Sequence, residues 1–123
     1  MKLLVTGSEG QLARSLLAAP KPAHVHIVAA GRPRLDLTRR ETVAAVLAAE
    51  APDMVVNSAA YTAVDQAERD PDAAMALNAE AAGVLAETCQ SVGIPILHVS
   101  TDYVFDGRKD TPYVEEDATG PIN

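Results

Sequence analysis

Short apolar segments alternate with alanine-rich segments along this chain, and this alternation restricts the fold more than any other feature of the sequence. The apolar segments, rich in β-branched residues, predict strands over 2–6, 24–30, 54–57 and 94–100. Apolar residues at helical spacing predict helices over 11–19, 38–50 and 72–92. Strands that alternate with crossover helices form a parallel sheet covered on both faces. The sequence therefore predicts a doubly wound α/β fold, truncated after about four strands.

The ends of the predicted helices carry recognisable capping residues. Thr38 and Glu41 have the spacing of a capping box, in which each side chain bonds a backbone N–H at a helix start. Pro71 suits the first position of the longest helix, and Gly93 suits the left-handed position after its last turn. These residues place the boundaries of the two helices that follow the second and third strands.

Composition excludes several classes of protein. The chain has 17 Asp and Glu against 10 Lys and Arg, and this net charge of −7 argues against nucleic-acid binding. No apolar run approaches the roughly 18 residues of a membrane helix, and the first residues, without an apolar h-region and cleavage site, do not predict a signal peptide. The single cysteine, Cys89, suits a buried site in a cytoplasmic protein. The spacing of His24 and His26 predicts no metal site, and His98 is expected to pack rather than to ligate.

The loop after the first strand has the spacing of a phosphate-binding turn. Its sequence Gly7-Ser8-Glu9-Gly10-Gln11-Leu12-Ala13 lies between a predicted strand and a predicted helix. Gly7 permits a tight turn, Gly10 lets the backbone approach a pyrophosphate, and the helix N-terminus offers N–H groups to an anion. We interpret the loop as the dinucleotide-binding turn of a Rossmann-like fold, with a plain tight turn as the alternative.

The segment after the second strand bears on the choice of cofactor. In many NAD sites an acidic residue about 20 positions past the glycine loop binds the ribose. This chain carries Arg32 and Arg34 there instead, which favours the 2′-phosphate of NADPH. The alternative is that both arginines are exposed loop residues with no role in cofactor binding. Asp36 and Leu37 follow, where a carboxylate can bind the adenine amino group and leucine can pack against the ring.

The ends of the third and fourth strands carry small and hydroxyl-bearing residues. The segment Ala59-Ala60-Tyr61-Thr62 combines room for a ribose and pyrophosphate with two hydroxyl groups. Thr101, beside Asp102, is a candidate for polarising a substrate carbonyl. The alternative for the first segment is that its residues are small only because they pack closely. The alternative for Thr101 is that it serves only as a cap or turn residue. Ligands of parallel sheets bind beyond the carboxyl ends of the strands, so we expect the four strand ends to face one crevice.

These segments together resemble the dTDP-4-dehydrorhamnose reductase family, within the extended short-chain dehydrogenase/reductases. The most specific matches are Ala-Tyr-Thr-Ala-Val-Asp at 60–65 and Ser-Thr-Asp-Tyr-Val-Phe at 100–105, and the similarity covers essentially the whole chain. The resemblance implies reduction of the 4-keto group of dTDP-4-dehydro-L-rhamnose to dTDP-L-rhamnose by hydride from NADPH. NADH is also used in the family.

The resemblance also implies roles for individual residues. Gly10-Gln11-Leu12 would hold the pyrophosphate, Asp36-Leu37 the adenine, and Ala60-Tyr61-Thr62 the ribose and phosphates. Thr101 would be the catalytic hydroxyl that bonds the substrate carbonyl oxygen. Asp102 would lie beside it on the dTDP-sugar side.

One catalytic motif of the family is missing from the chain. The family's proton donor is a tyrosine followed four residues later by a lysine that lowers its pKa. The residues four positions after tyrosines 61, 103 and 113 are Asp65, Gly107 and Asp117. We therefore expect residues 1–123 to be the N-terminal portion of an NAD(P)-binding Rossmann domain without the substrate domain, inactive alone.

Two other interpretations stay open. The missing motif also suits a non-catalytic dinucleotide-binding module that regulates another enzyme. A sugar-nucleotide epimerase or dehydratase of the same fold would share the glycine loop but should lack the motifs at 60–65 and 100–105. In any of these, the segment 94–99 would form an unpaired apolar edge of the sheet. We expect marginal stability or a homodimer through that edge.

Overall fold

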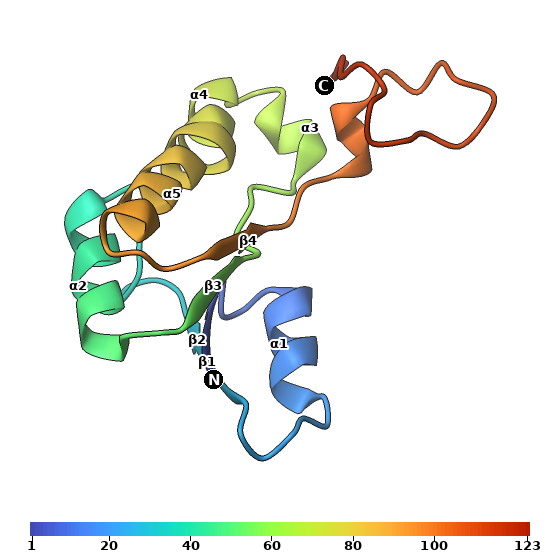
Figure 1. The fold of residues 1–123 in the computed structure, drawn as a ribbon. Helices are drawn as coiled ribbons and strands as arrows, with labels where there is room; N and C mark the ends of the chain where they lie inside the picture. Colours follow the sequence, from blue (N-terminus) through green and yellow to red (C-terminus); the bar gives the residue numbers. More distant parts are fainter.

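Four parallel strands form the centre of the computed structural model, which describes all of residues 1–123 (Figure 1). The strands are β1 (Lys2–Thr6), β2 (His26–Ala30), β3 (Met54–Asn57) and β4 (Ile96–His98), in the order β2-β1-β3-β4 across the sheet. Leu4 of β1 pairs with Val28 of β2 on one side and with Val55 of β3 on the other. Because all pairs are parallel, the carboxyl ends of the four strands lie at one edge.

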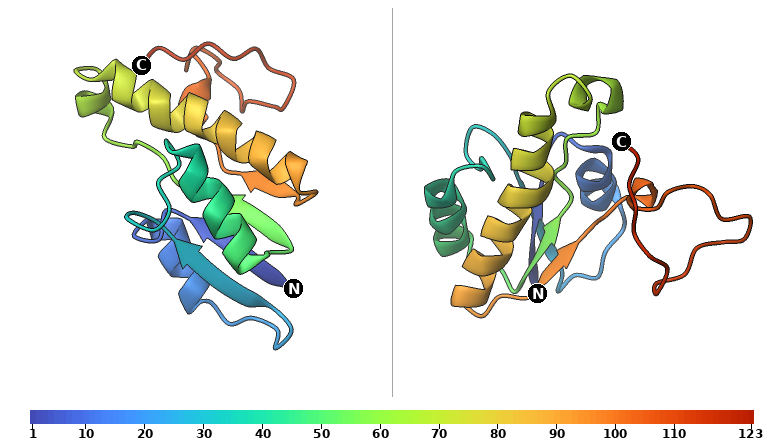
Figure 2. Two further views of the ribbon diagram at one scale, coloured as in Figure 1. Left: turned by 90° about the vertical axis from the view of Figure 1, so that its left-hand side faces the viewer. Right: turned by 90° about the horizontal axis from the view of Figure 1, so that it is seen from above.

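Helices cover both faces of this sheet. They are α1 (Gln11–Ala18), α2 (Arg40–Glu50), α3 (Val64–Ala67), α4 (Pro71–Met75) and α5 (Ala81–Ser91), with a π-helical turn η1 (Ala76–Glu80) and a 3-10 turn η2 (Asp102–Val104). Helix α1 lies on one face, and α2 and α5 lie on the other (Figures 1 and 2). This arrangement confirms the predicted Rossmann-like α/β fold. None of the helices has the length and apolar character needed to cross a membrane.

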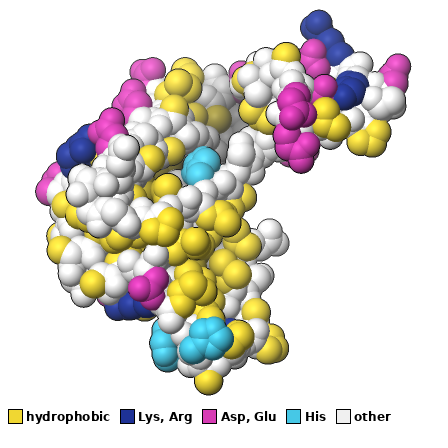
Figure 3. Space-filling model, in the orientation of Figure 1, with side chains coloured by type: hydrophobic (Ala, Val, Ile, Leu, Met, Phe, Trp, Pro, Cys, Tyr) yellow, Lys and Arg dark blue, Asp and Glu magenta, His cyan; other side chains and the backbone are white.

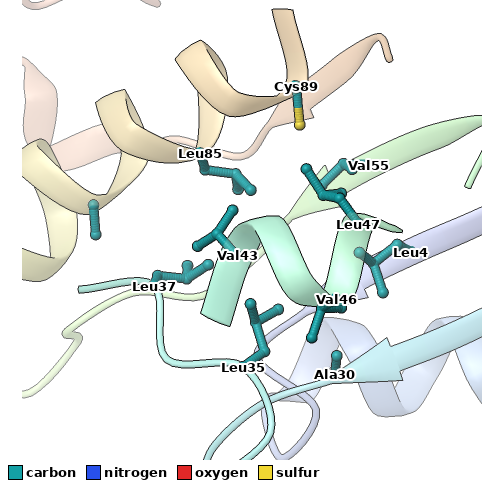
Figure 4. Close-up of a cluster of buried hydrophobic side chains, with 11 residues drawn as sticks. Leu4, Ala30, Leu35, Leu37, Val43, Val46, Leu47, Val55, Leu85 and Cys89 are labelled. Carbon is teal, nitrogen blue, oxygen red and sulfur yellow. The ribbon is translucent and has the colours of Figure 1, made fainter. Parts of the chain in front are cut away.

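The larger hydrophobic core lies between the sheet and helices α2 and α5. Figure 4 shows Val43 and Leu47 of α2 and Leu85 of α5 directed toward one another beside Leu4 of the sheet. Cys89 is fully buried in the same cluster, as predicted, and burial raises the pKa of its thiol. A protonated thiol in this position acts as a small apolar side chain. A second, smaller cluster joins β1 and β3 to α1 on the opposite face.

The start of α2 differs from the predicted capping box. The helix begins at Arg40, and no side chain caps it. Asp36 instead captures Thr38, because its Oδ1 accepts from both the N–H (3.0 Å) and the hydroxyl (2.7 Å) of that residue. Glu41 pairs with Arg39 rather than reaching back to the helix start. The capping-box prediction is wrong because a local Asx-type turn competes for the same hydroxyl.

The longest predicted helix is confirmed as the continuous run of α4, η1 and α5. It begins at Pro71, whose preceding residue Asp70 accepts a hydrogen bond from the N–H of Ala73 at 3.2 Å. It ends where Gly93 takes a φ of 71° and donates to the carbonyl of Gln90, as predicted for a left-handed terminating residue. The π-helical turn in the middle was not expected from the sequence.

Strand β4 lies at the edge of the sheet, as expected, but it is shorter than predicted. Only Ile96–His98 forms the strand, and its side chains Leu97 and the following Val99 are 50% and 43% exposed. In Figure 3 hydrophobic side chains gather over the middle of the molecule, in the region of β3 and β4. The edge is therefore apolar and unpaired in the isolated chain. Self-association through it stays a prediction.

Residues 105–120 form a loop that extends away from the sheet (Figure 2). The rings of Phe105 and Tyr113 stack with centroids 4.2 Å apart and planes within 8° of parallel. The Tyr113 hydroxyl donates to Asp106 at 2.9 Å, and Lys109 pairs with Asp117. The loop is thus shaped by contacts among its own side chains.

Candidate functional site

A cleft of about 1050 Å³ opens at the carboxyl ends of β1, β2 and β3. Of the residues offered for the dinucleotide, it lacks only Arg34 and brings together eleven: Gly7, Gly10, Gln11, Leu12, Arg32, Asp36, Leu37, Ala59, Ala60, Tyr61 and Thr62. They come from the loops after three different strands. The parallel sheet converges them because it directs every strand end to one edge.

Gly7 brings the glycine-rich turn close to the backbone of the loop after β3. Its φ of 75° lies in the left-handed region, and a Cβ there would stand 3.1 Å from the Cα of Ala59. Its carbonyl accepts from the N–H of Gly10 at 2.8 Å, which closes the turn. Helix α1 then starts without a side-chain cap or an acidic residue in its first turn. Its first N–H groups and the positive end of its dipole therefore face the cleft, as an anion site requires, although Glu9, just before the helix, also lines the cleft.

Gly31 brings the end of β2 against the glycine-rich loop. A Cβ on Gly31 would lie 2.5 Å from the hydroxyl oxygen of Ser8, so the two backbones approach as closely as glycine allows. Ser8 and Gly31 both line the cleft. The sequence did not predict these two residues as part of the cleft, because the ends of β1 and β2 come close only when the strands pair. The position of Ser8 inside the glycine motif was the one available signal.

The two arginines after β2 have separate positions. Arg32 lines the cleft. Arg34 turns away from it and pairs with Glu50 at the end of α2, a carboxylate that also pairs with Lys2 at 2.6 Å. Only one of the two is therefore available to a ligand in the cleft.

Asp36 faces the cleft as a carboxylate. The hydroxyl and then the N–H of Thr38, with the charges of Arg32 and Arg39 adding smaller effects, hold the pKa of Asp36 below its usual value. Both bonds from Thr38 go to Oδ1, which leaves Oδ2 available as an acceptor. An ionised carboxylate that only accepts suits an amino-group donor such as that of adenine.

The loop after β3 is held by a residue on the π-helical turn. Asn78 accepts from the N–H of Tyr61 at 2.7 Å and donates to the carbonyl of Tyr61 at 3.1 Å. This pair of bonds fixes the backbone of Tyr61 at the cleft wall. The Tyr61 hydroxyl is buried and has no hydrogen-bond partner. An unpaired buried hydroxyl on a cleft wall is what a polar group of a ligand would satisfy.

Thr101 and Asp102 do not line the cleft. Both are exposed, at the start of η2 beyond β4. The Thr101 hydroxyl accepts from the N–H of Tyr103 at 3.2 Å and donates to Asp102 at 3.3 Å. The structure thus brings together the predicted dinucleotide residues but leaves the two predicted substrate residues apart from them.

Three helix residues also line the cleft, although nothing in the sequence predicted them as part of a binding site. Ala73, Ala76 and Leu77 of α4 and η1 form the wall opposite the glycine loop. Their helical spacing is typical of any packed helix face. Only the path of α4 over the carboxyl edge of the sheet gives them this position.

No cluster of candidate metal ligands forms around the histidines. His24 and His26 are exposed, and no group of three or more His, Cys, Asp or Glu side chains converges anywhere in the structure. His98, which was expected to pack rather than to ligate, contacts Asn57 from the surface of the sheet. Its side chain is exposed, and its Nδ1 lies 2.9 Å from the Asn57 amide nitrogen.

A parallel sheet with a glycine-rich turn after its first strand and a cleft at its carboxyl edge defines a Rossmann-like α/β protein. Comparison with known proteins makes the assignment specific. The chain belongs to the RmlD substrate binding domain family, whose model matches residues 1–123.

Named relatives and solved structures agree with this family. A dTDP-4-dehydrorhamnose reductase of Sinorhizobium fredii is 51% identical over the whole chain, which covers 41% of that relative. A second relative, from Streptomyces antibioticus, is named as a probable dTDP-4,6-dihydroxy-2-methyloxan-3-one 4-ketoreductase. It is 46% identical over 98% of this chain, and the match covers 41% of that relative. The dTDP-4-dehydrorhamnose reductase of Bacillus anthracis, solved in complex with NADP, superposes with a TM-score of 0.94 at 36% identity, over 99% of this chain and 44% of that one. The chain therefore spans about two-fifths of the length of its relatives.

Proposed function

We propose that this chain carries the NADPH-binding part of a reductase that converts dTDP-4-dehydro-L-rhamnose to dTDP-L-rhamnose. The observation that carries the proposal is the convergence of eleven residues from three strand ends on one cleft. The Sinorhizobium relative has that reductase name, and the Bacillus structure contains NADP in the same fold. NADH would enter the same cleft with fewer contacts, since it lacks the 2′-phosphate.

The residues present fit a dinucleotide. Gly7 and Gly31 keep the wall free of side-chain atoms at the two closest approaches, and the buried Tyr61 hydroxyl lacks a partner. In the proposed complex Gly10-Gln11-Leu12 hold the pyrophosphate, Asp36-Leu37 hold the adenine, and Arg32 faces the 2′-phosphate. The remaining wall, Ala59 to Thr62, lies along the ribose. Bound NADPH supplies the hydride for the reduction.

We assign the substrate side to Thr101 and Asp102. Thr101 would donate its hydroxyl proton to the carbonyl oxygen of the dTDP-sugar as negative charge develops there. Its present bond to Asp102 is long, at 3.3 Å, and its hydroxyl is exposed, so the proton can be redirected by rotation about one bond. The chain's residues supply no tyrosine–lysine pair to protonate the product oxygen.

The first test measures NADPH binding and turnover of the keto-sugar in separate experiments. Titration of the purified chain with NADPH, followed by nicotinamide fluorescence, should give saturable binding in the roughly 1 µM to 1 mM range usual for enzyme ligands. Addition of the dTDP-4-keto-sugar should then cause no substrate-dependent loss of nicotinamide absorbance, because the proton donor is missing. Absence of NADPH binding would refute the proposed function, and turnover would refute the assignment of the missing donor.

We further propose that the chain acts in the cytoplasm and self-associates through β4. A single buried cysteine suits a reducing compartment. Two β4 edges can pair through their open backbone groups and cover Leu97 and Val99.

Sedimentation velocity tests the β4 contact directly. The unmodified chain should form a dimer as its concentration rises, and Leu97→Lys should remain monomeric because a charge on the edge disfavours pairing. Val92→Lys is the matched control, since Val92 is 57% exposed at the end of α5 and is not part of β4. A monomeric unmodified chain at high concentration would contradict the proposal.

A further inference from the structure

A hydrogen-bonded network at the ends of β1, β3 and β4 has no place in the roles assigned above. Thr6 and Asn57 are buried, with 0% and 1% of their surface exposed. The Thr6 hydroxyl donates to Oδ1 of Asn57 at 2.5 Å, and Nδ2 of Asn57 lies 2.9 Å from Nδ1 of His98. His98 is the register partner of Asn57 on the edge strand, and its side chain is exposed. The network therefore runs from the protein surface to the interior of the sheet.

Hydrogen-bonding capacity determines the direction of every bond in this network. The Thr6 oxygen accepts from the N–H groups of Ser58 and Ala59, both at 3.2 Å, which uses its two lone pairs. Its one proton must go to an acceptor, so Asn57 presents Oδ1 to Thr6. The Asn57 Nδ2 can only donate, so Nδ1 of His98 must accept. His98 is then a neutral imidazole with its proton on Nε2.

The network ends at the wall of the cleft. Ser58 and Ala59 line the cleft, and their N–H groups are held by Thr6. The Cα of Ala59 lies 3.1 Å from the position that a Cβ on Gly7 would take. A rotation of the Asn57 amide would remove the acceptor for the Thr6 proton and loosen both N–H groups. The orientation of this buried amide thus bears on how firmly Ser58 and Ala59 are held beside the glycine-rich turn, where the Ser58 hydroxyl also donates to the carbonyl of Thr6 at 2.7 Å.

We propose that His98 is a positioning residue for this cleft. Its Nδ1 fixes the orientation of the Asn57 amide, and through Thr6 it holds the backbone of Ser58 and Ala59 against Gly7. His98 touches no ligand. The identity of the ligand rests on the proposed function, whereas the network itself does not.

A matched pair of variants tests the role. Asparagine and leucine have nearly the same shape, but only asparagine offers an oxygen acceptor near the position of Nδ1. We expect His98→Asn to bind NADPH within about twofold of the unmodified chain. We expect His98→Leu to bind roughly tenfold more weakly, because a buried amide N–H loses its partner. Equal binding by the leucine variant would overturn the proposal.

Two measurements without ligand keep the proposal independent of the proposed function. Nitrogen-15 NMR of the imidazole should show Nδ1 unprotonated and Nε2 protonated in the unmodified chain, and the reverse tautomer would overturn the proposal. Amide hydrogen exchange at Ser58 and Ala59 should be slow in the unmodified chain and in His98→Asn, and faster in His98→Leu. If NADPH does not bind the unmodified chain, the proposed function fails and these two results still decide the role of His98. If the leucine variant does not fold, the tautomer decides it.

Discussion

Replacing Gly7 with alanine is expected to weaken NADPH binding roughly tenfold, because the loop after β3 must move aside by a few tenths of an ångström at the cleft wall. The added Cβ would meet the Cα of Ala59 at 3.1 Å, and a backbone atom cannot rotate aside. The φ of 75° adds a conformational cost of about 1–2 kcal/mol to the free energy of folding. Binding is followed by fluorescence titration and stability by urea unfolding.

Gly83→Ala is the matched control for this substitution. Gly83 lies within α5, and a Cβ there would have no neighbour within 4 Å. Alanine should stabilise the helix by about 0.5–1 kcal/mol and leave NADPH affinity unchanged. If Gly7→Ala bound NADPH like the unmodified chain, the glycine-rich turn would not be the pyrophosphate site.

Replacing Arg32 with serine is expected to weaken NADPH binding roughly 10- to 100-fold and to leave NADH binding within about twofold. Arg32 is the arginine that lines the cleft, beside Asp36 and Thr38. A guanidinium forms strong charge-assisted bonds to a phosphate, and only NADPH carries the 2′-phosphate. Parallel titrations with the two nucleotides measure the ratio directly.

Arg34→Ser provides the control two residues away. Arg34 pairs with Glu50 outside the cleft, so its loss should change neither nucleotide affinity by more than about twofold, as expected for an exposed ion pair. A change of nucleotide preference in the Arg34 variant, with none in the Arg32 variant, would contradict the assignment.

The sequence predicted well wherever the signal was local. Pro71 begins α4 and Gly93 ends the run after α5, because each residue restricts its own backbone regardless of its neighbours in space. Thr38 shows the limit of this reasoning. Its hydroxyl suited a helix cap, but in the structure this hydroxyl donates to the carboxylate of Asp36, two residues earlier.

The positions of several residues depend on contacts with segments far away in the sequence. Arg32 and Arg34 are equivalent in sequence, yet Glu50 removes one of them from the cleft. Asn78 gave no local sign of its role, because its two bonds to Tyr61 span 17 residues of chain. The exposure of the His98 side chain was likewise hidden, since alternation along a strand does not show how far neighbouring elements cover each side chain.

The order of strands and helices, the glycine-rich turn and the strand-end residues that line the cleft were determined by the sequence alone. These features depend on backbone restriction and hydrophobic periodicity, which act over a few residues. Tertiary structure alone decided which arginine faces the cleft, that Thr101 lies outside it, and that His98 is linked to Thr6 through Asn57. Those outcomes depend on bonds such as Thr6–Asn57 and Asn57–His98, which join residues 51 and 41 positions apart and form only when the strands pair.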